Sequence, residues 1–185
     1  DRLLIKIGLS HVHLKHFDEA ESHINEGLKV CGSNCSEQIL IEGKFGLGVA
    51  NFGQESFDEA RDYFNESLEL SVKTNNKRFQ AENLVYLGKI AIIQKRYGDA
   101  LKFLSQAESL ANASGYNQLL IDTYKQFSLL YNAQKDFEKA SDYQNRYINL
   151  KDSLIGEELV KNVSKIQSNF EERENLATIK LKEDA

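Results

Sequence analysis

The sequence of 185 residues contains no proline, no tryptophan and no methionine. Turns between β-strands usually use some proline, so its absence favours a nearly all-helical chain. No apolar run approaches the roughly eighteen residues that a membrane-spanning helix needs, so the sequence as given is not expected to insert into a bilayer. Because the chain starts at Asp1 inside a helical pattern, without an initiator methionine, we expect a fragment of a longer protein.

Basic clusters and catalytic motifs are missing as well. The net charge is −5 and the basic residues are scattered, which argues against a nucleic-acid partner, because phosphate backbones need a clustered basic surface. The sequence has no Gly-rich phosphate loop, nucleophile elbow or zinc-protease motif. Adjacent acids such as Asp58 and Glu59 point to different sides of a helix and are interpreted as solvated charges. We therefore predict no catalytic residue, no cofactor and no enzyme activity in this fragment.

Cysteine is scarce. Cys31 and Cys35 are separated by three residues, a spacing that matches neither the redox C-x-x-C motif nor half of a known zinc site. A local disulfide is one interpretation, in an oxidising compartment. Two ordinary thiols at a helix end are the favoured one.

The four histidines all lie near the N-terminus, at 11, 13, 16 and 23. Glu19 and His23 share one face of a predicted helix, and His16 precedes that helix. A metal site would need these three side chains to converge, but His16 is expected in a turn and pointing elsewhere. The sequence therefore predicts no metal site, and the histidines are interpreted as solvated.

A repeat of 40 residues is the strongest feature of the sequence. The repeated tetrads are Phe17-Asp18-Glu19-Ala20, Phe57-Asp58-Glu59-Ala60, Tyr97-Gly98-Asp99-Ala100 and Phe137-Glu138-Lys139-Ala140. Twelve residues before each alanine stands a small residue: Gly8, Gly48, Gly88 and Ser128. Four residues after the first three alanines stand Ile24, Phe64 and Leu104, whereas Gln144 breaks this column.

These columns predict one helix pair per repeat. The small residue in the first helix lets the second helix approach closely, and the returning alanine fills the matching gap with a methyl group. The aromatic residue that opens each second helix is expected to fill the space between neighbouring pairs. One pair cannot bury its own apolar face, but stacked neighbours form a continuous core.

The small residue, the aromatic-acidic-acidic-alanine tetrad and the following apolar residue resemble the tetratricopeptide repeat, over about residues 1 to 150. The usual unit is shorter, about 34 residues, and the extra residues here are expected to lengthen both helices. This sequence lacks the tryptophan and the closing proline of that family. The resemblance implies an all-α, right-handed superhelix of four helix pairs with a long C-terminal helix.

A narrower resemblance appears near the end of the repeats. The segment Tyr147-Ile148-Asn149-Leu150-Lys151-Asp152-Ser153-Leu154 is similar to the last repeats of bacterial tetratricopeptide sensor histidine kinases and related transcriptional regulators. In those proteins a repeat array precedes a connector, a membrane helix and a kinase or DNA-binding output. The resemblance implies the sensory input region of a signalling protein. The compartment stays open, being periplasmic for a membrane-tethered sensor and cytoplasmic otherwise.

Residues after about 152 leave the 40-residue pattern. Ser153 is expected to cap a new helix, followed by an apolar stripe of helical or heptad spacing: Ile155, Leu159, Val163, Ile166 and Phe170. Two interpretations remain open. The segment 153–185 is either a cap over the exposed face of the fourth repeat in 1–152, or a connector that forms a weak homodimer.

The resemblance also implies a binding surface, because the first helices of such arrays line a concave groove. Carried over residue by residue, the groove is lined by Ile5, Leu9, Val12, Phe45, Val49, Phe52, Val85, Lys89, Ile92, Lys125 and Leu129. This set is more apolar than a water-facing wall, so we expect a hydrophobic helix or an extended peptide as the guest. The alternatives to a sensor are a free-standing cytoplasmic scaffold and, from another class, a non-catalytic fragment of an enzyme.

Overall fold

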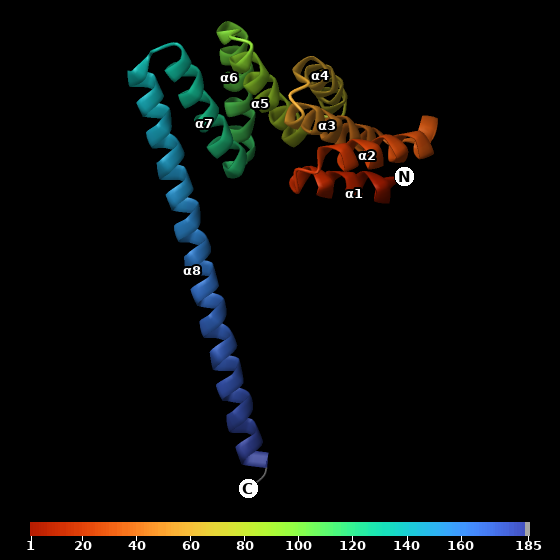
Figure 1. The fold of residues 1–185 in the computed structure, drawn as a ribbon. Coiled ribbons are helices and arrows are strands. Elements are labelled where there is room, and N and C mark those ends of the chain that lie inside the picture. Colours follow the sequence, from red (N-terminus) through yellow and green to blue (C-terminus); the bar gives the residue numbers. More distant parts are fainter. Residues whose placement is uncertain (184–185) are drawn as a thin grey trace.

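The computed structural model describes the backbone of residues 1–183 and the side chains of residues 1–169, 171 and 172. This part of the chain is helical and contains no strand (Figure 1). The elements in order are α1 (Arg2–His13), α2 (Phe17–Cys31), the 3-10 turn η1 (Gly32–Asn34), α3 (Glu37–Gly53), α4 (Phe57–Lys73), α5 (Lys77–Ile93), α6 (Tyr97–Ser114), α7 (Asn117–Ala133) and α8 (Phe137–Glu183). The predicted all-α solenoid of helix pairs is therefore confirmed.

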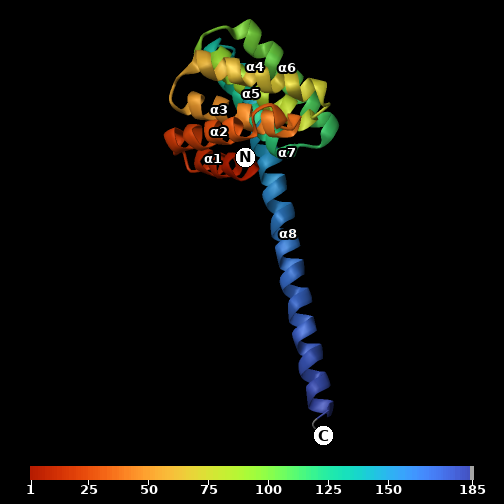
Figure 2. The same ribbon diagram turned by 90° about the vertical axis from the view of Figure 1, so that its right-hand side faces the viewer.

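The helices form two curved layers, one on the inner side of the curve and one on the outer side. Each odd-numbered helix contacts the next, so that α1 meets α3, α3 meets α5, and α5 meets α7. Among the described residues, the even-numbered helices do not approach one another as closely, and α6 and α8 are joined by an ion pair of 3.7 Å between Glu108 and Arg146. The odd-numbered helices therefore form the closely spaced inner layer, and the even-numbered helices fan apart on the outside (Figures 1 and 2).

Close approach within each pair depends on the small residue of the first helix. A Cβ atom built on Gly48 would lie 2.6 Å from the ring of Phe64, and one on Gly88 would lie 2.7 Å from Leu104. Gly8 stands in the same relation to Ile24, at 2.5 Å. The predicted contact between these two columns is confirmed, and the four alanines of the tetrads are all buried as expected.

The fourth pair replaces this contact with a different one. Ser128 stands where the other pairs have glycine, and its hydroxyl donates a hydrogen bond to the carbonyl oxygen of Ala140 at 3.0 Å. Gln144, which breaks the apolar column, is exposed. Tyr143 fills the space instead, stacking on Phe127 with ring centroids 4.4 Å apart.

The aromatic residue that opens α2 packs toward the following pair. The ring of Phe17 lies directly against Gly53 of α3, where even a Cβ atom would collide with it. Phe137 holds the same position in the fourth pair, but no described residue packs over it and it is 65% exposed. Phe17 therefore fills the space between two pairs as expected, whereas Phe137 has no following pair within the described residues to pack against.

The turns inside the pairs share one backbone feature that the sequence analysis missed. Residues at 15, 55, 95 and 135 all have positive φ angles, between 58° and 64°, and none is glycine. They are three lysines and one glutamate, so the column carries only a weak sequence signal. A left-handed conformation costs a non-glycine residue about 1–2 kcal/mol, and the hydrogen-bonded turn around it must offset that cost.

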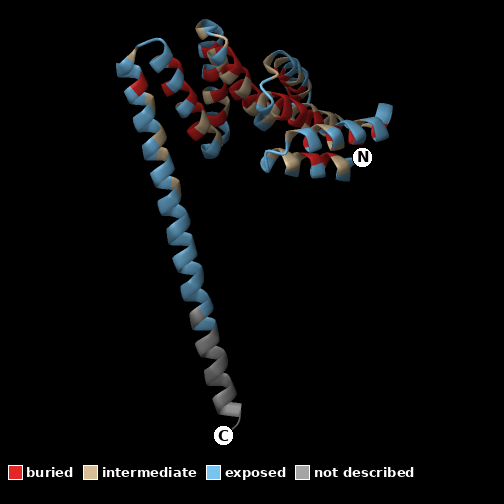
Figure 3. Cartoon of the chain, in the orientation of Figure 1, coloured by how far each residue is buried: buried red, intermediate tan, exposed pale blue. Residues whose placement is uncertain are grey.

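The last helix differs from the prediction in two respects. Ser153 does not start a new helix, because α8 runs without a break from Phe137 to Glu183. The C-terminal part also does not cap the array: beyond Leu154, every side chain that the structure describes is exposed (Figure 3). Because α8 continues as one straight helix, the residues that follow the fourth repeat extend away from the array and do not pack on it. The side chain of Phe170 lies outside the described residues.

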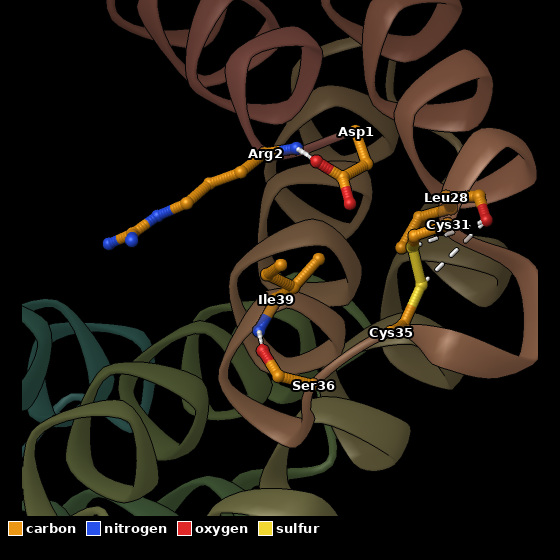
Figure 4. The surroundings of a disulfide bond; sticks show 7 residues. All are labelled: Asp1, Arg2, Leu28, Cys31, Cys35, Ser36 and Ile39. Carbon is orange, nitrogen blue, oxygen red and sulfur yellow. Dashed lines mark hydrogen bonds between the residues drawn. A yellow bond between two sulfur atoms is a disulfide. The ribbon is translucent and has the colours of Figure 1, made fainter.

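Cys31 and Cys35 are joined in a disulfide between the end of α2 and the residue that follows η1 (Figure 4). Their Cα atoms are 5.0 Å apart, within the range that a disulfide requires. The favoured interpretation of two ordinary thiols was therefore wrong, because η1 turns the chain back and brings Cys35 beside Cys31. The disulfide closes the connection between the first and second pairs.

Candidate recognition surface

The inner layer holds most of the predicted groove residues, but two of them are core residues. Ile5 and Val85 are each 1% exposed, so neither can contact a ligand, and their assignment to the groove was wrong. They face inward because their helices also pack against the outer layer. The half-buried members are Leu9, Val12, Phe45, Val49, Phe52, Lys89 and Ile92, and the exposed members are Lys125 and Leu129.

The aromatic members of the set support the fold as well as line the surface. Phe45 packs edge-on against Tyr86, with ring centroids 5.6 Å apart, and Phe52 does so at 5.5 Å. Tyr86 in turn stacks on the fully buried Phe64, at 4.7 Å. Serine at Phe45 or Phe52 is thus expected to weaken the fold itself, so these residues are unsuitable for separating binding from stability.

A charged network occupies the middle of the inner face, between α5 and α7. The Nζ atom of Lys89 lies 2.7 Å from Oδ2 of Asp122, and Nε2 of Gln126 donates to the other carboxylate oxygen at 3.2 Å. The same Nζ atom lies 4.3 Å from the ring centroid of Tyr86. Lys89 is therefore held by an acid and an aromatic face at once, and its ion pair with Asp122 joins the third and fourth inner helices, α5 and α7.

The pKa of the Tyr86 hydroxyl is also shifted from its usual value. Burial raises the pKa of Tyr86 to about 12, and the nearby charges of Asp122 and Glu82 add to the effect. The tyrosine is therefore neutral over the whole physiological range, and its ring lies between the stacked Phe64 and the Nζ atom of Lys89.

A line of acids runs along the inner helices at the 40-residue spacing: Glu42, Glu82 and Asp122. Each has a partner in its own chain. Glu82 accepts from Nε of Arg78 at 2.9 Å, and Glu42 accepts from Nε2 of Gln38 at 2.6 Å. Asp122 is paired with Lys89 and Glu82 with Arg78, whereas Glu42 meets only a neutral amide and Lys125 is exposed. The inner face therefore combines apolar area with a few charges.

Two of the four histidines, His11 and His23, are less solvated than predicted, whereas His13 and His16 are exposed as expected. The rings of His11 and His23 lie 5.3 Å apart between α1 and α2, and His16 lies 5.8 Å from His11. The Nδ1 atoms of His11 and His23 are buried and make no hydrogen bond within the described residues. Even so, across the side chains that the structure describes, no three His, Cys, Asp or Glu groups are arranged to hold a metal ion.

A scan against protein-family models finds a tetratricopeptide repeat family over residues 37–113 and again over 79–153. These two overlapping matches cover more than half of the chain, and they fall on the helix pairs described above. The chain belongs to the tetratricopeptide repeat family. The resemblance inferred from the sequence is thereby confirmed, and the family is one of non-catalytic scaffolds that recognise other proteins.

Two solved structures share the fold of this tetratricopeptide repeat protein. Aspartyl phosphate phosphatase F from Bacillus subtilis matches 83% of the chain with a TM-score of 0.75 at 13% identity, and BtubC (BKLC) from P. vanneervenii matches 83% with a TM-score of 0.67 at 18% identity. The matched region covers 42% and 63% of those two proteins, respectively. Such low identities show a common fold and nothing finer. A search among curated proteins finds no significant match.

The outer side of the tetratricopeptide array has a hollow that sequence reasoning did not find. It lies between α4 and α6 over the start of α5, and it is lined mainly by leucine and valine side chains, including Leu68, Val72, Leu84 and Leu110. Since these residues come from three helices, only the packing brings them together.

None of the helices in the described part of the chain has the length and apolar character that a membrane span requires.

Proposed function

We propose that the inner face of this array binds a segment of another protein, and that the chain is the sensory input region of a bacterial signal-transduction protein of the histidine kinase type. In this proposal residues 1–152 receive the ligand, and residues 153–185 connect it to an output. The observation that carries the binding proposal is the inner layer itself, where half-buried apolar side chains surround a paired charged network.

The composition of this face favours a mostly apolar guest. Leu9, Val12 and Val49 lie half-buried in the first two inner helices, and Leu129 is 48% exposed in the fourth. Apolar area that remains open to water gains free energy when a partner covers it, by about 25 cal/mol per Å². The neutral Tyr86 hydroxyl can add hydrogen bonds in the centre. An amphipathic helix or an extended peptide with apolar side chains fits this pattern.

Three observations support the signalling part. The segment from Tyr147 to Leu154 resembles the end of the repeat region in bacterial sensor kinases. One of the proteins with the same fold is bacterial and, by its name, acts on an aspartyl phosphate. In addition, α8 leads directly from the fourth repeat away from the array, as a connector to an output would.

The binding proposal can be tested without knowing the natural ligand. A random peptide library is selected on the purified chain, and the affinity of the selected peptides is measured by fluorescence anisotropy. We expect Leu129→Glu to weaken binding at least about tenfold, because it places a charge in an apolar contact. Val72→Glu, an equally drastic change on the outer layer, serves as the matched control. Peptides that lose binding with Val72→Glu but not with Leu129→Glu would contradict the inner-face proposal.

The signalling proposal has a simpler test, which is to read the coding sequence downstream of Ala185. A membrane helix followed by a kinase or DNA-binding domain is the expected result. A catalytic domain of metabolism, or a scaffold protein made only of further repeats, would contradict the sensor proposal and leave the inner-face proposal untouched.

A further inference from the structure

The part of α8 beyond the array is a long helix without a partner. From Phe137 to Leu154 the helix packs on α7 through a seam of buried or half-buried residues: Ala140, Tyr143, Tyr147, Leu150 and Leu154. Beyond the seam the helix continues to Glu183, which corresponds to about 40 Å of projecting helix. Figures 1 and 2 show it leaving the array in both views.

The projecting helix carries an apolar stripe that points away from the array. Ile155, Leu159, Val163 and Ile166 are between 46% and 67% exposed. At about 100° per residue, the mean direction of this stripe lies about 135° from that of the seam. The helix therefore cannot fold the stripe onto its own array without a break, and the described backbone has none.

The charged residues of this segment lie on the side of the helix away from the apolar stripe. With Val163 at position a of a heptad, Leu159 and Ile166 occupy position d. The neighbouring e and g positions are uncharged from 155 to 169: Ile155, Val160, Asn162, Gln167 and Asn169. The charged residues of the same stretch all fall at the outer b, c and f positions: Glu157, Glu158, Lys161 and Lys165. Coiled coils often carry Glu and Lys at e and g, where these residues form salt bridges between the helices. Here those positions are uncharged, so a partner helix would meet uncharged residues on both sides of the stripe, and no charged group would lose water on pairing.

We propose that the occupant of this stripe is a second copy of the same chain, paired in parallel and in register through Leu159, Val163 and Ile166. A β-branched residue at position a with leucine at position d favours two parallel strands. Val163 with Leu159 follows this pattern, whereas the second d position holds the β-branched Ile166. Because the seam faces away from the stripe, the two arrays lie on the outer sides of the pair and do not collide.

The flanking residues distinguish parallel from antiparallel pairing. In a parallel pair each g residue faces the e residue five positions later in the second copy. Ile155 then meets Val160 of the second copy, and Asn162 meets Gln167 of the second copy, so that apolar pairs with apolar and amide with amide. An antiparallel pair would set Val160 against Gln167, which leaves an amide beside a valine.

The pairing is weak in this chain. The stripe that the structure describes spans about two heptads, and a helix contact of that length is marginal in water. The dimer is therefore concentration-dependent. It does not rest on the groove, so either proposal can fail without the other.

Sedimentation equilibrium of the whole chain, over a wide concentration range, tests the dimer. The unchanged chain is expected to pass from monomer to dimer as its concentration rises. Leu159→Glu combined with Ile166→Glu should raise the dissociation constant by at least about tenfold, because it places carboxylates in the interface. Ser164→Glu combined with Ser168→Glu adds the same charge at the outer positions b and f, and it should leave the dissociation constant nearly unchanged. A chain that stays monomeric throughout, or two double variants that behave alike, would overturn the proposal.

The orientation has its own test by oxidative cross-linking. Gly156 is the a position above Leu159, and no atom lies within 4 Å of a Cβ atom built there, so Gly156→Cys is tolerated. In the parallel pair the two introduced thiols are adjacent and form an intermolecular disulfide, whereas in an antiparallel pair they lie far apart. Ser164→Cys, on the outer side, is the control. Dimers that cross-link through Ser164→Cys as fast as through Gly156→Cys, or through neither, would overturn the proposed register.

Discussion

The helix pairs and the projecting part of α8 are built from the same kind of amphipathic helix, yet they end in opposite environments. Phe64 in α4 is fully buried, whereas Leu159 in α8 is 63% exposed, although both stand in an apolar stripe of helical spacing. The difference lies in the neighbours: Phe64 packs into the space that Gly48 leaves open, whereas the described side chains of α8 beyond Leu154 are covered by no other helix. Periodicity thus specifies a helix, and the repetition of small residues specifies what buries it.

The largest difference between the two regions is expected when the space at Gly48 is filled. Gly48→Leu should destabilise the array by about 3 kcal/mol or more, because its Cβ atom alone would lie 2.6 Å from the Phe64 ring. We expect the melting temperature, measured by circular dichroism, to fall by roughly 6–12 °C. The matched control is Gly156→Leu in the projecting helix, where a Cβ atom meets nothing and the melting temperature of the array should not fall. Equal effects at the two glycines would mean that the repeat register is wrong.

A second prediction uses the buried Tyr86, for which the projecting helix has no equivalent. Its pKa is raised to about 12 in the folded protein from 10.0, so the unfolded chain ionises first as the pH rises. The neutral tyrosine therefore stabilises the fold fully below pH 10, and this contribution is lost between about pH 10 and pH 12. The loss attributable to Tyr86 should reach up to about 2–3 kcal/mol. Urea unfolding at pH 9 and pH 11.5, compared with Tyr86→Phe, isolates it, and an identical alkaline loss in the variant would contradict the assignment.

The third prediction concerns the ion pair that joins the inner helices. Lys89→Met and Asp122→Asn should each destabilise the array, because each leaves a half-buried partner without its hydrogen bond. The double variant should cost less than the sum, with a coupling energy of about 1 kcal/mol. A double-mutant cycle by urea unfolding measures this coupling. Strict additivity would mean that the contact contributes nothing to joining the third and fourth pairs.

The smallest effect is expected in the turns. Lys95 has a φ angle of 58°, a conformation that glycine adopts without strain. Lys95→Gly should therefore stabilise the array slightly or leave it unchanged, by at most about 1 kcal/mol, because relief of strain competes with the larger entropy of the unfolded chain. Lys161→Gly, inside the projecting helix, should instead lower the helical signal. A clear loss of stability with Lys95→Gly would contradict the described turn.

Much of the fold was accessible from the sequence because its determinants are local and repeated. The glycine and alanine columns occur at constant spacing, so they predicted the number of pairs and their closest contacts. Features that depend on how the helices pack against one another could not be predicted from the sequence. The burial of Ile5, the pairing of Lys89 with Asp122 and the contact of His11 with His23 each join helices whose relative position no spacing encodes.

The same limit explains the errors in the C-terminal segment and in the candidate groove. Ser153 is a good capping residue, but the helix that reaches it is already formed and nothing in the chain stops it there. Phe45 and Phe52 occupy groove positions of the repeat, yet their size lets them reach Tyr86 and join the core. A position in the repeat predicts which helix face a residue takes, whereas its burial depends on the particular side chains around it.

The most direct test of this account is hydrogen exchange followed by mass spectrometry at several protein concentrations. The account predicts strong, concentration-independent protection of the amides in α3 to α7, and weak protection of residues 155–169 that grows with concentration as the stripes pair. Equal protection of both regions at every concentration would contradict it, because the projecting helix would then be held by something other than a second copy.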